Sequence, residues 1–142
     1  MKKIAVLYWS SMGNTEKMAQ AIAEGAKAAG AEVKLDEMAN STPAALAAYD
    51  AVALGCSATG DEVLDDGIVE PFVEALAKVD LSKKTVLLFG SHDWGDGTWM
   101  RNWEECMSGY GVGLLLDSVT AQNEPDEAAL AECQSAGEQL TH

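Results

Sequence analysis

Short apolar runs alternate along the chain with stretches in which apolar residues recur every three or four positions. The runs have the length of buried strands, and the periodic stretches have the length of helices. This alternation is typical of a parallel sheet that is covered by helices on both faces. Strands are expected over residues 3–9, 32–36, 51–55, 85–90 and 113 to about 120.

Helices are expected over residues 15–29, 68–77, 98–110 and 126–140, with a weaker one over 43–49. The first of these places Met18, Ile22 and Ala26 on one face, and Gly30 is suited to end it. Trp99 and Trp103, four residues apart on the third long helix, are most simply core residues. The three well-separated cysteines are interpreted as buried thiols.

Five strands joined by right-handed crossovers fit a single α/β domain over residues 1–142, with a doubly wound sheet in the order 2-1-3-4-5. That topology places ligands at the carboxyl ends of the central strands. The loops that follow Trp9, Gly55 and Gly90 are therefore the candidate binding site.

The net charge of the chain limits the kinds of molecule that it is expected to bind. The chain has 9 basic and 23 acidic residues, a net charge of -14. Binding to nucleic acid or to an anionic membrane needs a basic patch, so neither is expected. A basic protein partner is favoured, with solubility as the alternative explanation of the acidity.

The first apolar run is too short for a secretory leader or a membrane span, which predicts a cytoplasmic protein. Cys56, Cys106 and Cys133 suggest neither a disulfide framework nor a metal site. His92 and His142 cannot form a metal cluster by themselves. No metal is expected.

The first candidate loop is a run of small polar residues that leads directly into a helix. It offers hydroxyls, backbone N–H groups and a helix N-terminus, which together can hold a phosphate. It contains no Lys or Arg, which suits a phosphate that anchors a cofactor better than one that is transferred. A turn that only caps the helix is the alternative. The loop consists of Ser10, Ser11, Met12, Gly13, Asn14 and Thr15.

This loop resembles the FMN-phosphate loop of flavodoxins, with Met12 standing where Thr is usual. The loop after the third strand resembles the flavin loop of the short flavodoxins of anaerobic bacteria. In that family a Gly peptide turns over on reduction and a Glu binds the flavin N3–H, roles that fall on Gly60 and Glu62. The second loop contains Ser57, Ala58, Thr59, Gly60, Asp61 and Glu62, with Thr59 in place of the usual Met.

The loop after the fourth strand resembles the second flavin loop of the family, in which an aromatic residue stacks on the ring. Trp94 takes that role here, with a buried structural role as the alternative. His92 and Asp93 replace the Tyr and Gly more usual in close relatives; His92 is expected to be an exposed bystander rather than a pH reporter. The loop contains Ser91, His92, Asp93, Trp94 and Gly95.

Tyr110, Gly111 and residues 121–127 also resemble the last strand and final helix of the family, so the resemblance covers essentially the whole chain. It implies a flavodoxin-like three-layer sandwich and a low-potential one-electron carrier with non-covalent FMN. The expected carrier is a monomer that is not itself an enzyme, and its partners are larger redox enzymes that dock at the acidic flavin edge. An FMN-dependent quinone or nitro reductase of the same fold is the alternative.

Two other classes of protein could share this alternation of strands and helices, but residues that their active sites require are missing here. A response-regulator receiver needs acidic residues after its first and third strands, where this chain has Ser10 and Cys56. A Cys-x5-Arg phosphatase would use Cys56, but the residue six positions on is Glu62, and the thiol lies among acids that oppose its ionisation.

Overall fold

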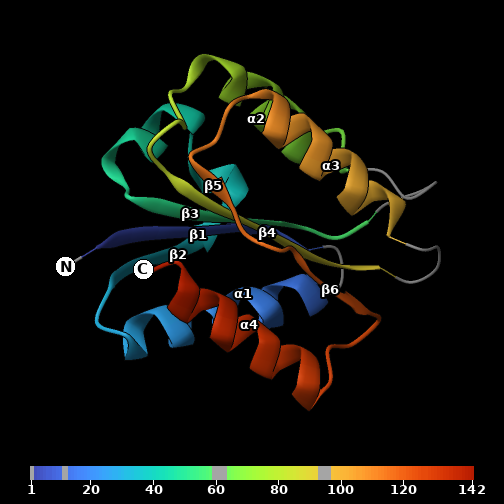
Figure 1. Ribbon diagram of the computed structural model, residues 1–142. Coiled ribbons are helices and arrows are strands. Elements are labelled where there is room, and N and C mark those ends of the chain that lie inside the picture. The colour runs from blue at the N-terminus through green and yellow to red at the C-terminus, as the bar shows by residue number, and fades with distance from the viewer. Residues whose placement is uncertain (1, 11–12, 59–63, 93–96) are drawn as a thin grey trace.

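The computed structural model describes residues 2–10, 13–58, 64–92 and 97–142 as a sheet between two layers of helices (Figure 1). The strands are β1 (Lys3–Trp9), β2 (Glu32–Glu37), β3 (Ala51–Cys56), β4 (Thr85–His92), β5 (Leu114–Leu115) and β6 (Val119–Gln122). The α-helices are α1 (Asn14–Ala28), α2 (Val69–Ala75), α3 (Thr98–Gly109) and α4 (Glu127–Gln139). None of these helices is long and apolar enough to cross a membrane.

The strand order is β2-β1-β3-β4-β5, and every pairing is parallel. The predicted order 2-1-3-4-5 is therefore confirmed. The last strand, predicted to be continuous, is divided into β5 and β6, which both pair with β4. Three residues, 116–118, lie opposite two residues of β4, and this bulge is the physical reason for the break.

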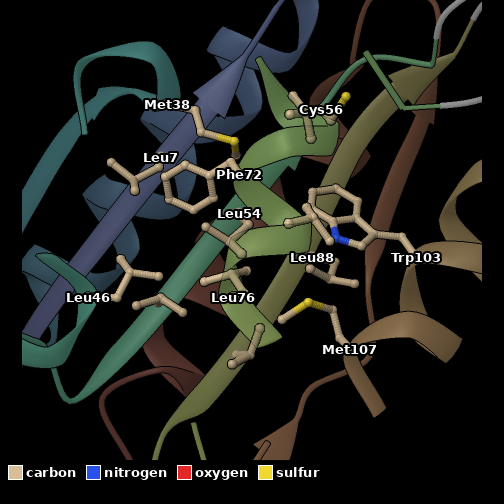
Figure 2. Packing of buried hydrophobic residues seen from close by; sticks show 14 of the residues in the cluster. Leu7, Met38, Leu46, Leu54, Cys56, Phe72, Leu76, Leu88, Trp103 and Met107 are labelled. Atoms are coloured by element: carbon tan, nitrogen blue, oxygen red, sulfur yellow. The ribbon is translucent and has the colours of Figure 1, made fainter. Parts of the chain in front are cut away.

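The core has two parts because successive side chains of each central strand point to opposite faces of the sheet. Ile4 and Val6 pack with α1 and α4, whereas Ala5 and Leu7 pack on the side of α2 and α3. Figure 1 shows these helix pairs on opposite faces, and Figure 2 shows the packing on the α2 and α3 side. Trp99 and Trp103 are buried there, as the helical spacing predicts.

The elements that differ from the predictions are short. Residues 43–49 were expected to form a weak helix and instead form a 3-10 helix, Pro43–Ala48. Helix α2 is shorter than the expected 68–77, and a 3-10 turn, Leu76–Lys78, continues it. Asp65 lies just before α2, and its Oδ2 accepts hydrogen bonds from the N–H groups of Ile68 (2.6 Å) and Val69 (3.0 Å).

Helices α1 and α4 pack so closely that glycine is required on both. A Cβ atom on Gly25 would lie 2.0 Å from the carbonyl oxygen of Gln134, and one on Gly137 would lie 2.1 Å from that of Ile22. The backbone atoms that define these contacts cannot move without separating the helices. This reciprocal contact therefore fixes the distance between α1 and α4.

Replacing Gly137 with alanine is expected to destabilise the protein by about 1–3 kcal/mol, the usual range for overpacking a core. Gly109→Ala is the matched control, because Gly109 also lies in a helix but a Cβ there would meet no atom within 4 Å. Urea unfolding of both variants measures the difference. Equal unfolding midpoints for the two variants would show that the helix contact does not need its glycines.

Candidate functional site

The junction between β1 and α1 brings a helix N-terminus to the carboxyl edge of the sheet. Gly13 precedes the helix with φ 92°, a left-handed conformation that glycine adopts without steric cost. Its N–H donates to Ser10 Oγ at 2.9 Å. Among the described residues no side chain caps α1, and the first intrahelical bond runs from Lys17 N–H to the Gly13 carbonyl. The N–H groups of the first turn, at Asn14, Thr15 and Glu16, thus have no partner within the helix.

Three hydroxyl groups meet beneath this junction, one from each of the three candidate loops. Thr15, Ser57 and Ser91 are buried, with exposed fractions of 0%, 4% and 5%. Thr15 Oγ1 lies 2.7 Å from Ser57 Oγ and 3.0 Å from Ser91 Oγ. It also accepts a hydrogen bond from the Ser91 backbone N–H at 3.2 Å.

Backbone hydrogen bonds hold the ends of the three central strands side by side. Ser57 N–H donates to the Trp9 carbonyl at 3.2 Å, and Ala58 N–H donates to the Ser91 carbonyl at 2.9 Å. Trp99 Nε1 donates to the Cys56 carbonyl at 3.2 Å, which attaches the start of α3 to β3. The described ends of the three candidate loops therefore lie next to one another.

His92 ends β4 and is half-buried, so the expectation that it is exposed is wrong. Its ring packs on the buried Trp99, with the two centroids 5.2 Å apart and an interplanar angle of 50°. The backbone carbonyl of His92 accepts a hydrogen bond from Asn123 N–H at 2.7 Å. Asn123 has φ 58°, a conformation in which asparagine is enriched. This contact, which the sequence reading did not anticipate, joins the loop after β6 to the site.

The structure thus gathers part of the predicted set at one edge of the sheet: Ser10, Gly13, Asn14, Thr15, Ser57, Ala58, Ser91 and His92. The other predicted residues fall outside the described ranges and stay predictions: Ser11, Met12, Thr59, Gly60, Asp61, Glu62, Asp93, Trp94 and Gly95. Within the described ranges no group of three or more metal-ligating side chains occurs.

The cysteines are unpaired, and two of them are deeply buried. Burial raises the pKa of the Cys56 thiol to about 12, and burial likewise raises the pKa of Cys133 to about 12. Cys56 Sγ donates to the Ser57 carbonyl at 3.2 Å. A thiol that stays protonated at neutral pH is not a nucleophile, which agrees with the exclusion of a Cys-x5-Arg phosphatase. Cys106, expected to be buried as well, is only half-buried.

The parallel sheet defines a doubly wound α/β protein, and its carboxyl edge presents the N-terminus of α1 and three buried hydroxyls. The flavodoxin family model matches residues 6–137. A flavodoxin of Clostridium beijerinckii is 44% identical over 137 residues, which cover 96% of this chain and 98% of that protein. The solution structure of two-electron reduced Megasphaera elsdenii flavodoxin is 39% identical, with a TM-score of 0.87 over 95% of this chain and 96% of that one.

The chain belongs to the flavodoxin family. It is therefore an FMN-binding electron-transfer protein rather than an enzyme, as the resemblance of its loops predicts. Similarity to quinone reductases is weaker. An NAD(P)H dehydrogenase (quinone) of Methylocella silvestris is 31% identical over 92% of this chain, which corresponds to 63% of that protein.

Thiol labelling is expected to follow burial. In the native protein at neutral pH, Cys106 should react with iodoacetamide first, whereas Cys56 and Cys133 should react only after unfolding, because both are buried and protonated. Peptide mass spectrometry before and after addition of denaturant locates the label. Native labelling of Cys56 at a rate similar to that of Cys106 would contradict the buried position of the β3 end.

Proposed function

We propose that this chain is a single-domain, low-potential one-electron carrier that anchors FMN by its phosphate at the β1–α1 junction. The observation that carries the proposal is the meeting of the α1 N-terminus with the buried hydroxyls of Thr15, Ser57 and Ser91. Helix N–H groups and hydroxyls suit a phosphate without supplying a positive charge. The donors proposed are the hydroxyls of Ser10, Ser11 and Ser57, and the backbone N–H groups of residues 11, 12, 14 and 15.

The flavin ring is assigned to the loops that follow β3 and β4. The hydrogen bond from Ala58 N–H to the Ser91 carbonyl supports this assignment, because it starts both loops side by side. From there, residues 59–62 would contact one face of the ring and Trp94 would stack on the other. FMN supplies the redox chemistry when bound, and these residues orient it and limit its contact with water.

Redox enzymes with a basic surface are the partners proposed, docking at the carboxyl edge of the sheet. Support comes from the net charge of -14 and from exposed acids beside that edge, such as Asp66 and Glu70. We also propose that the protein is a monomer in the cytoplasm, where its three unpaired cysteines would stay reduced.

A quinone reductase of the same fold is the function to distinguish from the carrier, because the chain is partially similar to the Methylocella silvestris protein. Oxidation of NADPH with a quinone, in the absence of any partner protein, separates the two functions. Turnover at a rate typical of enzymes would favour the reductase, and negligible turnover would favour the carrier.

The apoprotein is expected to bind FMN on the order of a hundredfold or more tightly than riboflavin, because several charge-assisted hydrogen bonds hold the phosphate. Calorimetric titration of the same apoprotein with both ligands gives the ratio. Similar affinities for the two ligands would show that the β1–α1 junction does not bind the phosphate.

Neutralising Asp66 and Glu70 together, as Asp66→Asn and Glu70→Gln, should raise the potential of the second one-electron reduction. One unit charge at about 10 Å in an effective dielectric near 20 corresponds to about 70 mV before screening, which exposure and salt reduce severalfold. We expect a rise of roughly 10–30 mV and slower electron transfer to a cationic acceptor at low salt.

The matched control is Glu32→Gln, which removes an exposed charge at the opposite edge, where β2 begins. Asp65 is left intact because its carboxylate caps α2. Spectroelectrochemistry and stopped-flow kinetics at two salt concentrations measure both effects. Because the control removes one charge and the double variant removes two, a control shift about half as large as that of the double variant would show that the acids beside the site act only through the net charge.

A further inference from the structure

The three buried hydroxyls form a hydrogen-bonded chain. The direction in which they donate to one another is restricted to two arrangements. A hydroxyl has one proton and accepts two hydrogen bonds. Thr15 Oγ1 already accepts one from the Ser91 backbone N–H at 3.2 Å. It can therefore accept only one more and donate one, although serine hydroxyls lie at 2.7 Å and 3.0 Å. One serine must donate to Thr15 while the other accepts from it.

In each of the two possible directions, one hydroxyl proton has no acceptor among the three hydroxyls, and it is a different proton in each case. When Ser57 donates to Thr15 and Thr15 donates to Ser91, the remaining proton belongs to Ser91. When Ser91 donates to Thr15 and Thr15 donates to Ser57, the remaining proton belongs to Ser57. Ser57 is the serine held beside the end of β1, through its N–H bond to the Trp9 carbonyl.

We propose that a bound phosphate selects the second direction and that Ser91 is thereby a positioning residue for the phosphate, although it lies at the end of β4. The inference rests on the phosphate site of the proposed function. A phosphate dianion can only accept hydrogen bonds, so it favours the arrangement in which Ser57 has a proton to donate. Ser91 acts through Thr15, because hydrogen bonds in a low-dielectric chain polarise one another. The end of β4 and the β1–α1 junction are therefore coupled.

The Ser91→Ala variant distinguishes a role of Ser91 in positioning the phosphate from a role confined to the end of β4. Removing the Ser91 hydroxyl leaves Ser57 and Thr15 in place but takes away the donor that sets the direction of the chain. We expect FMN affinity to fall about three- to tenfold, the range of one net hydrogen bond, and riboflavin affinity to change less than twofold. Calorimetric titration of the apoprotein with FMN and with riboflavin measures the ratio of the two affinities.

Ser118→Ala is the matched control. The Ser118 hydroxyl is also partly buried and donates to Glu104 Oε2 at 3.0 Å, but it lies between β5 and β6. Its removal should leave the ratio of FMN to riboflavin affinity at the wild-type value. A ratio that falls equally in this control would show that loss of stability, rather than the hydroxyl chain, lowers FMN affinity.

A second pair of variants tests the middle of the chain and covers the case in which Ser91→Ala does not fold. Thr15→Ser keeps the hydroxyl and should keep the affinity ratio near the wild-type value. Thr15→Val keeps the shape, leaves the Ser91 N–H without its acceptor and should lower the ratio more than Ser91→Ala does. Equal ratios for Thr15→Ser and Thr15→Val would overturn the proposal.

The outcomes for Ser91→Ala are equally distinct. A selective loss of FMN affinity supports the coupling. An equal loss for both ligands would show that Ser91 supports only the end of β4, and unchanged affinities would show that it has no role in binding either ligand, so both results overturn the proposal. If the wild-type apoprotein itself binds FMN and riboflavin equally, the phosphate site is wrong, which is a separate failure of the proposed function.

Discussion

Helices cover the central strands of this sheet on both faces, and that constraint decides where polar chemistry can lie. All six residues of β3 are buried, and so are the six interior residues of β4. Their apolar side chains fill the two apolar clusters, whereas Ser91, at the carboxyl end of β4, bonds to Thr15. A ligand can therefore reach the strands only at their ends. At the carboxyl edge the chain turns into loops and the helix N-terminus of α1.

The same constraint explains which elements the sequence predicted well. Strand β1 has the predicted bounds, and α1 begins and ends within one residue of the prediction, because both have long, regular apolar patterns. The division between β5 and β6 depends on how residues 116–118 face β4, which no local pattern contains. Residues 43–48 form a 3-10 helix because so short a segment gains few bonds for the cost of starting an α-helix.

The site was predictable in its location and less so in its internal contacts. Strand order alone brings the loops after Trp9, Gly55 and Gly90 to one edge, and the family resemblance supplies the roles of residues 59–62 and 93–95, which stay predictions. The hydroxyl chain is different: Thr15 lies 42 residues from Ser57 and 76 from Ser91. Serines in polar loops are usually exposed, so only the three-dimensional structure reveals that these are buried. His92 was misjudged for the same reason, since its packing on Trp99 depends on where α3 begins.

Residues 10–15 contain no basic residue, and this links the proposed phosphate site to the proposed low redox potential. Lys17 is the basic residue nearest to that loop in the sequence, and its Nζ pairs with Glu124 Oε1 at 2.6 Å. A lysine against the phosphate would neutralise part of its charge and make a further negative charge nearby easier to add. Neutral donors would bind the same phosphate through their dipoles and leave its net charge in place. In the proposed site that charge, together with the acids nearby, would oppose addition of the second electron, so that the proposed anchoring of FMN and the proposed low potential would have one electrostatic origin.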